Sequence, residues 1–463
     1  MHNDRELVEE LRRSLEQEPP TLPQNVLDLR EADIADVLNE LSLFEAAHTL
    51  RHLPLETAIR LCDQPSLHRR GAILEQLEPA QAAGILLGLS SDERAQVLRE
   101  MSPHERRRML PSLPQEICAE IELLLRYPAK TAGGIMTTEF VNLDPSITVA
   151  DALAHIREVA AEMESIYACY VLEPGSRRLL GAVSLRDLVL ADPAARVTSV
   201  MRTKPISVQA GEPQQRVAQK ISKYNLLAAP VLEEGGQVVG FVTVDDVIDV
   251  MVEEETESAL RMAAVEPGAM DEPYMSTPFP VMVRKRATWL VVLFLGEMLT
   301  ATAMGYFEDE IAKAVVLALF VPLIISSGGN SGSQASTIVI RAMALGEFRL
   351  ADWWSVARRE VFCGLALGAI LGVVGFLRIA LWSACSSIYR PHWALVGLTV
   401  ALSLLGVVLW GTISGSMLPL ILRRLGIDPA TSSAPFVATL VDVTGLVIYF
   451  TVAFGVMSNC VVR

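Results

Sequence analysis

The sequence predicts a multidomain protein in which an α-helical domain, an α/β domain and an α-helical membrane domain follow one another. Leucine-rich amphipathic stretches separated by prolines fill the first part of the chain, an internal repeat with strand and helix patterns fills the middle, and long apolar segments fill the last part. We therefore expect a superhelical N-terminal helical domain over residues 1–128, a tandem α/β pair over 129–243, a connecting acidic helix and linker over 244–283, and a membrane domain of five transmembrane helices over 284–463.

Charge is divided unevenly along the chain. The whole chain carries a net −15, and the part from Arg284 onward holds 13 Lys and Arg against 9 Asp and Glu, so the preceding part carries −19. An acidic soluble part argues against nucleic acid as a partner, because proteins that bind nucleic acid present basic faces. The charged N-terminus has no apolar core of the kind found in signal peptides, so we expect the soluble part in the cytoplasm.

The prolines of the first region divide it into short helices. Pro54, Pro79 and Pro103 are almost evenly spaced, as expected for stacked helix pairs. Ser91 followed by Asp92 predicts a helix start, because a capping hydroxyl precedes acidic residues in the first turn.

The middle region contains two related copies. The run GAVSLRD from Gly181 matches GFVTVDD from Gly240, and each copy predicts a strand, a helix, two further strands and a helix. This pattern resembles a tandem pair of cystathionine beta-synthase (CBS) domains, in which the Ser/Thr and Asp of the motif lie where adenosine ribose and phosphates bind. In the first copy Ser184 and Asp187 occupy these positions, and Arg186 offers a phosphate partner. The alternative, that Asp187 only caps its helix, stays open.

The segment 244–265 predicts one helix with an acidic face. Asp245, Asp249, Glu253 and Glu257 recur every four residues, and like charges at this spacing repel one another. A solvated acidic face is the ordinary explanation. The alternative is that a divalent cation bridges this face to an acidic neighbour and acts as a switch.

Five apolar segments predict five membrane spans, at about 287–306, 311–340, 360–382, 393–421 and 434–458. Arginines follow spans two and four, whereas the loop after span one is acidic at 308–310. By the positive-inside rule the chain is a multi-pass protein of the cell membrane with a cytoplasmic N-terminus and an extracytoplasmic C-terminus. Arg390, in an outside loop, fits this assignment least well.

Asp442 is the single charge in the last apolar span. A carboxylate in hydrocarbon costs about 2.5–3.5 kcal/mol or more, so a cation, a water-filled path or a partner charge must offset this cost. One explanation places Asp442 near interfacial water at the helix end. The position within the span favours the other, in which Asp442 lines a cation path.

Two further polar features lie in the membrane region. Span two contains SSGGNSGSQ from Ser326, whose glycines serve either close helix packing or a polar path, and Asn330 favours the path. Glu297 in span one is a second intramembrane carboxylate, which either contributes to the path or lies near water without a role.

Three membrane motifs, together with the domain order, resemble the MgtE family of magnesium channels. The motifs are P-x5-GGNSGSQ from Pro322, SGSMLPLILRRLGIDPA between spans four and five, and ATLVDVTG around Asp442. The resemblance implies a homodimer in the bilayer with the pore between two membrane domains. It also implies closure when cytosolic Mg²⁺ binds the acidic connecting ("plug") helix and CBS pair, with ATP binding known in some members.

The resemblance also implies site residues. The pore site for hydrated Mg²⁺ is formed by Asp442, Ala438, Thr439 and Asn330; the regulatory Mg²⁺ site by Asp92, Asp246, Asp249, Glu254 and Glu257; and the nucleotide site by Tyr170, Ser184, Arg186 and Asp187. Mg²⁺ prefers oxygen ligands and loses water reluctantly, which suits one carboxylate per chain in a pore. Cys, Met and His clusters do not line the pore motif, so copper and zinc are disfavoured relative to Co²⁺ or Mn²⁺.

These features predict a Mg²⁺ channel for uptake, gated by cytosolic Mg²⁺ and modulated by ATP, rather than an enzyme. Two alternatives stay open. The first is a cation-coupled exchanger, for which Glu297 is the only support in the sequence. The second is a nucleotide-sensing membrane regulator that transports nothing, against which Asp442 and the polar motif of span two argue.

Overall fold

The computed structural model describes residues 2–15, 23, 26, 28–161, 163–266, 277–308, 315–385 and 392–461. Contacts divide the chain into two compact units, one containing the described residues up to Glu254 and the other those from Glu255 onward. Parts of the predicted linker (267–276), residues 309–310 of the acidic loop, residues 311–314 at the predicted start of span two and the loop residue Arg390 lie outside the described residues.

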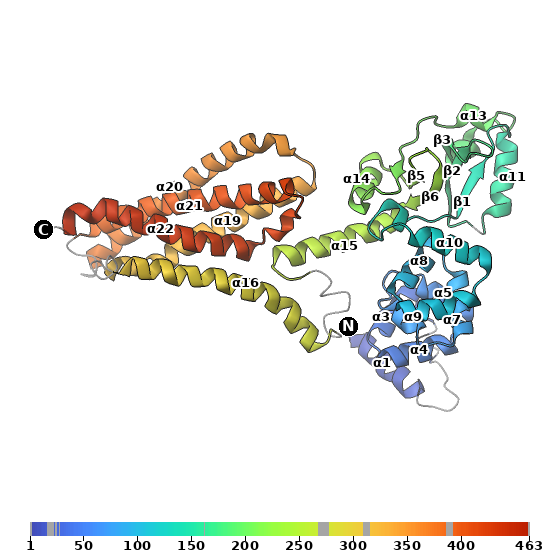
Figure 1. The fold of residues 1–463 in the computed structure, drawn as a ribbon, viewed down its shortest axis with the longest axis horizontal. Coiled ribbons are helices and arrows are strands. Elements are labelled where there is room, and N and C mark those ends of the chain that lie inside the picture. The colour runs from blue at the N-terminus through green and yellow to red at the C-terminus, as the bar shows by residue number, and fades with distance from the viewer. Residues whose placement is uncertain are drawn as a thin grey trace. The chain divides into compact units, whose positions relative to one another are not determined.

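The first unit begins with short stacked helices, as the sequence predicts (Figure 1). Pro79 and Pro103 each occupy the first position of a helix, where proline's missing N–H costs no hydrogen bond. Fully buried leucines from successive helices, among them Leu38, Leu61 and Leu86, form one core. The helices are α1 (His2–Leu15), α3 (Glu31–Asn39), α4 (Leu43–His52), α5 (Leu55–Cys62), α6 (Arg70–Leu74), α7 (Pro79–Gly88), α8 (Ser91–Glu100), α9 (Pro103–Met109) and α10 (Gln115–Leu125).

Two three-stranded sheets follow, and they confirm the predicted repeat. In each copy the first strand pairs parallel to the second, and the third pairs antiparallel to the second. The first copy contains β1 (Phe140–Leu143), α11 (Val149–Val159), β2 (Ser165–Leu172), β3 (Leu179–Ser184), α12 (Leu185–Leu190) and α13 (Val197–Val200). The second contains β4 (Val208–Gln209), α14 (Gln214–Tyr224), β5 (Ala228–Leu232) and β6 (Val238–Thr243).

The predicted acidic helix is present as α15 (Val244–Met262), which follows β6 without a turn. It is continuous, as expected for a segment without Gly or Pro, and ends three residues earlier than the predicted position 265. Its residues up to Glu254 belong to the first unit and the remainder to the second.

The second unit contains five helical segments long and apolar enough to cross a membrane, which confirms the predicted number of spans among the described residues. Its helices are α16 (Phe279–Tyr306), α18 (Val315–Ala318), α19 (Val321–Ala344), α20 (Trp353–Cys385), α21 (Trp393–Arg424) and α22 (Ala434–Val461). Span two is broken between α18 and α19, where Pro322 stands in the first turn of the new helix. The helix α16 begins at Phe279, inside the segment that the sequence assigns to the linker.

Glycines bring the central helices α19 and α21 into backbone contact. A Cβ added to Gly411 would lie 2.4 Å from the Gly328 carbonyl oxygen, and one added to Gly415 would lie 2.1 Å from that of Gly332. On α19, a Cβ added to Gly328 would lie 2.4 Å from the Val407 side chain, and one added to Gly332 would lie 2.9 Å from the Gly411 carbonyl oxygen. The packing explanation for the small residues of span two therefore applies to Gly328 and Gly332. By contrast, none of the described residues of α16 is buried within the chain.

Candidate functional sites

Asp442 lies on α22 where this helix meets α19. A Cβ added to Gly329 of α19 would lie 3.4 Å from the Ala438 Cβ and 3.7 Å from the Asp442 Oδ1. Gly329 thus leaves space for the carboxylate beside α19. One turn before Asp442, the Thr439 methyl lies against Gly296 of α16, where an added Cβ would approach it to 3.0 Å. Parts of three helices therefore converge around the predicted pore residues.

The other predicted pore residues lie close to this point. Ala438 and Thr439 precede Asp442 by one turn, and Asn330 directly follows Gly329. The Thr439 hydroxyl donates to the Pro435 carbonyl at 3.1 Å, so its oxygen keeps a lone pair for an ion's water. Asn330 is exposed within the single chain and donates weakly to Ser326 Oγ at 3.5 Å.

Glu297 follows Gly296 on α16 and is exposed within the chain. Its carboxylate interacts electrostatically with Asp442. The structure therefore brings the two predicted intramembrane carboxylates near each other, although they lie on the first and last spans.

A second site lies in the soluble unit, where Asp92, Glu164 and Asp246 offer carboxylate oxygens within 4.8 Å of one another. Asp92 stands in the first turn of α8, Glu164 directly before β2, and Asp246 in the first turn of α15. Asp92 is only 7% exposed, and among the described residues no hydrogen-bond partner reaches its Oδ1 or Glu164 Oε2. Two of the three clustered carboxyl groups thus each have a buried oxygen without a donor, which suits an oxygen-ligated cation.

The electrostatics of this cluster also fit a cation. Burial raises the pKa of Glu164 to about 9, with further contributions from Asp92 and Asp246. Burial raises the pKa of Asp246 to about 8, again with a contribution from Asp92, although a hydrogen bond from Thr243 opposes the shift. Burial likewise raises the pKa of Asp92. The charged forms are therefore costly without a metal, and a divalent ion would supply the missing positive charge.

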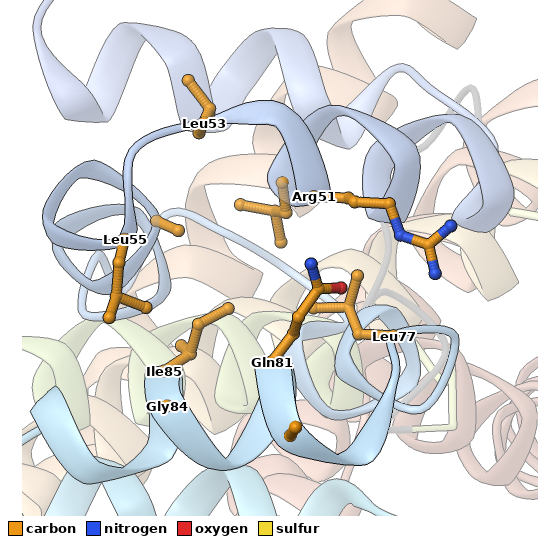
Figure 2. A pocket seen from close by; sticks show the side chains of 10 residues that line it. Arg51, Leu53, Leu55, Leu77, Gln81, Gly84 and Ile85 are labelled. Carbon is orange, nitrogen blue, oxygen red and sulfur yellow. The ribbon is translucent and has the colours of Figure 1, made fainter.

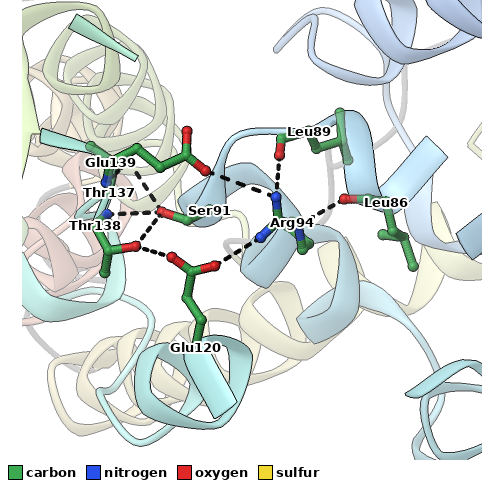
Figure 3. Close-up of polar contacts among 8 residues, drawn as sticks. All are labelled: Leu86, Leu89, Ser91, Arg94, Glu120, Thr137, Thr138 and Glu139. Carbon is green, nitrogen blue, oxygen red and sulfur yellow. Dashed lines mark hydrogen bonds and ion pairs between the residues drawn. The ribbon is translucent and has the colours of Figure 1, made fainter. Parts of the chain in front are cut away.

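A hydrogen-bond network fixes the start of α8, the helix that carries Asp92 (Figure 3). Next to Asp92, Ser91 Oγ accepts from the Thr138 backbone N–H at 2.9 Å and bonds the Thr137 hydroxyl at 3.1 Å. Arg94, one turn later, donates to the Leu86 carbonyl at 2.7 Å and to Glu120 at 3.0 Å. These bonds fix the start of α8 against the segment that leads into β1.

The sequence predicted two of the three residues in this cluster and missed Glu164. The structure brings together Asp92 and Asp246, both of which the sequence predicted to bind a metal ion, and Glu164 is the third member of the group. No motif surrounds Glu164 in the sequence, so only the path of the folded chain reveals it.

The three remaining predicted regulatory residues lie outside this cluster. Asp249 has an exposed side chain, and partial desolvation of its carboxylate, together with the neighbouring charge of Asp245, raises its pKa. Glu254 accepts from the side chains of Gln214 and Gln215 at 3.0 and 2.5 Å. Glu257 accepts from Arg261 at 3.0 Å. The last two carboxylates already have side-chain donors, and their binding of Mg²⁺ stays a prediction.

The residues predicted to bind a nucleotide differ from one another in burial and hydrogen bonding. Ser184 accepts from the Asp187 N–H at 3.0 Å, so the serine rather than Asp187 caps α12. Arg186 is exposed. The Tyr170 ring is 1% exposed and packs against Phe140 and Phe241, with centroids 5.8 and 6.1 Å away, so the side chain belongs to the core. Tyr170 also lies on the central strand of its sheet, paired with Asn142 on one side and Ala182 on the other.

A cavity of about 260 Å³ lies elsewhere, between α4, α5 and α7 (Figure 2). Leucine, isoleucine and alanine side chains line most of it, with Arg51 and Gln81 as polar members. None of the predicted site residues lines this cavity.

Three family models cover most of the chain. A model described as a divalent cation transporter, MgtE, matches residues 321–452; the MgtE intracellular N domain matches 29–130; and the CBS domain matches 132–193 and 197–253. The chain is 35% identical over 431 residues to the magnesium transporter MgtE of Thermus thermophilus, covering 87% of this chain and 93% of that protein. The chain belongs to the MgtE family. The MgtE of Bacillus subtilis is 32% identical, with 93% of each chain covered.

MgtE-family membership confirms the resemblance seen in the sequence and identifies a multi-pass membrane protein of a magnesium transporter family. Among solved structures, the cytosolic domain of the Mg²⁺ channel MgtE in complex with ATP is 33% identical and covers 53% of this chain and 99% of that chain, with a TM-score of 0.49. The soluble part of a magnesium transporter is 30% identical, covers 54% and 99%, and has a TM-score of 0.48.

The raised pKa values of the carboxylate cluster predict how the metal-free site responds to pH. Unfolded carboxyls titrate near pH 4, so up to about pH 8 the folded cluster holds protons that the unfolded chain has lost. The stability of the metal-free unit therefore falls as pH rises through this window. Mg²⁺ displaces the same protons, so its apparent affinity rises with pH by about tenfold per unit for each proton released.

Hydrogen exchange of the first turns of α8 and α15, followed during Mg²⁺ titrations at several pH values, measures this dependence. The double variant E164Q/D246N should lose most of this dependence, because Asp92 is then the only carboxyl of the cluster that still titrates. A wild-type Mg²⁺ midpoint that stays constant between about pH 6 and pH 8 would contradict the assignment.

Proposed function

We propose that this MgtE-family protein is a homodimeric, Mg²⁺-selective channel that admits Mg²⁺ into the cytoplasm and closes when cytosolic Mg²⁺ binds its soluble unit. The observation that carries the gating proposal is the cluster of Asp92, Glu164 and Asp246, which joins the helical domain, the first CBS copy and α15. A Mg²⁺ ion bound there would displace the protons of the cluster and tie three separate segments together through their carboxylates.

The pore is proposed to hold hydrated Mg²⁺ at Asp442. Mg²⁺ keeps most of its water, so one carboxylate from each of two chains, with Ala438, Thr439 and Asn330 contacting water molecules, forms a suitable site. An oxygen-only site also accepts Co²⁺ or Mn²⁺, so the proposed selectivity is for small hard divalent cations. The proposal places the N-terminus in the cytoplasm, the C-terminus outside, and no catalytic activity in the chain.

A coupled exchanger is the alternative that one observation favours, because Glu297 lies near Asp442 and adds a second titratable group. Recording from purified protein in lipid, with Mg²⁺ as the only permeant cation, separates the two. Current that follows the Mg²⁺ gradient supports the channel, whereas flux that requires a counter-ion supports the exchanger. A nucleotide-sensing regulator would show no flux.

We further propose that ATP binds the first CBS copy. The exposed Arg186 offers a guanidinium for phosphate, and Asp187 offers a carboxylate for ribose hydroxyls. Tyr170 lies on β2, which pairs with the strand that ends at Ser184, directly before these two residues.

Calorimetry of ATP binding to the full chain tests this site. We expect R186A or D187A to weaken binding by about tenfold or more, because each removes a charge-assisted hydrogen bond. The variant D192A, which changes an exposed aspartate just beyond α12, is the matched control. Wild-type affinity in both R186A and D187A would exclude the site.

A further inference from the structure

The last turn of α15 carries an arginine that serves two carboxylates. Arg261 donates through Nη2 to Glu257 Oε2 at 3.0 Å, one turn earlier on the same helix. Through Nη1 it donates to Asp428 Oδ2, in the loop that follows α21. All three side chains belong to the second unit.

Asp428 is also part of the structure that begins α22. Its Oδ1 accepts from the Ala430 N–H at 2.9 Å and so caps the short 3₁₀ turn η4 (Pro429–Thr431). Ser432 and Ser433, each 1% exposed, connect this turn to α22.

The helix α19 holds the same connection from another side. Ser336 donates to the Ser432 carbonyl at 3.0 Å, and Ser333 donates to the Ala434 carbonyl at 3.1 Å. Asn330 lies one turn before Ser333 on α19, and Asp442 lies two turns after Ala434 on α22. A force on Asp428 therefore acts on a loop that is bonded to both helices of the predicted pore site.

We infer that Arg261 is a built-in cation that fastens the end of α15 to the loop preceding α22, so that this connection needs no bound metal ion. Without the guanidinium, Glu257 and Asp428 would face each other as two carboxylates. Arginine suits the position because its planar group stays charged at all physiological pH values and presents separate donors to two acceptors.

The functional consequence rests on the proposed function. Asp246 and Arg261 stand in the first and last turns of one continuous helix, about 22 Å apart along its axis. When Mg²⁺ binds the cluster at the first turn, the helix transmits the displacement to α22 through Arg261. The metal-dependent and the metal-independent contacts of α15 are thus at opposite ends.

The test compares R261Q, D428N and the charge exchange R261E/D428R with R424Q. Arg424 is the matched control, an exposed arginine at the end of α21 in the same unit. Two quantities are measured on the full chain in lipid: hydrogen exchange of the last turn of α15 without Mg²⁺, and the cytosolic Mg²⁺ concentration that halves the flux.

In R261Q and D428N we expect both the exchange rate and the half-inhibitory Mg²⁺ concentration to rise about threefold, the size expected for one partly exposed ion pair. The charge exchange should recover at least half of each change on a logarithmic scale, and R424Q should match the wild type.

Equal hydrogen-exchange rates in R261Q, D428N and R424Q would overturn the inference. So would values for R261E/D428R that are no closer to the wild type than those of R261Q. The hydrogen-exchange measurement does not depend on transport. If Mg²⁺ does not inhibit the wild-type protein, the proposed gating is refuted, but hydrogen exchange still tests whether Arg261 connects α15 to Asp428.

Discussion

Asp442→Ala is expected to abolish Mg²⁺ permeation, with a loss of at least about 100-fold in flux, because it removes the negative charge that attracts the hydrated ion in a low-dielectric pore. The structure places Asp442 beside Gly329 of α19, where no Cβ fills the space next to the carboxylate. Asp442→Asn keeps an oxygen that can accept from the ion's water, so we expect partial flux from it. The measurement is Mg²⁺ uptake into liposomes that contain equal amounts of each variant.

Two controls make this result specific. Glu347→Ala changes an exposed carboxylate of the second unit outside the predicted spans, and it should leave the flux unchanged. Size-exclusion chromatography of Asp442→Ala should show the wild-type assembly. Wild-type uptake by Asp442→Ala would refute the pore assignment.

In the same assay, Glu297→Gln separates the two transport mechanisms, since a passive channel keeps gradient-driven current and a carboxylate-coupled exchanger loses it.

Neutralising the soluble cluster is expected to have the second largest effect. In D92N/E164Q/D246N, we expect the channel to stay open at Mg²⁺ concentrations at least about tenfold above those that close the wild type. A shift from 1:99 to 99:1 requires about 5.5 kcal/mol of differential binding, and removing three of the available ligands takes away a large part of it. Patch recordings with varied cytoplasmic Mg²⁺ provide the measurement.

The opposite outcome for the triple variant is closure without Mg²⁺. If the cost of burying the three carboxyls together outweighs their contribution to metal binding, the triple variant closes without Mg²⁺, because amide side chains can come together without first taking up protons. We expect the first outcome, since two of the oxygens have no donor among the described residues and a bound ion would supply each with a partner.

The matched control is E253Q, an exposed change on the same helix whose carboxylate pairs with Lys130 at 3.1 Å. It should close at the wild-type Mg²⁺ concentration. Limited proteolysis of residues 244–283 with and without Mg²⁺ gives an independent readout, and identical cleavage in both conditions would count against Mg²⁺-driven compaction.

The sequence alone determined the order of architectures and the positions where chemistry occurs along the chain. Proline spacing predicted the stacked helices, the matched runs at Gly181 and Gly240 predicted the paired sheets, and apolar length predicted five spans. These features depend on residues that are close together or regularly spaced in the sequence, so they can be recognised without the structure. For the same reason, the lone carboxylate Asp442 and the glycine-rich motif of span two could be recognised in the sequence alone.

Only the tertiary structure decided which of the acidic residues come together. Asp245, Asp249, Glu253 and Glu257 share a face by helical spacing, yet the buried cluster uses Asp246 with Asp92 and Glu164, which are distant in sequence. The tertiary structure also showed that Glu254 and Glu257 already accept hydrogen bonds from glutamine and arginine side chains, and that Tyr170 is a core residue. The physical reason is that helical spacing fixes which residues share a face. Burial, and the positions of other segments, fix whether a carboxylate meets a donor, another carboxylate or water.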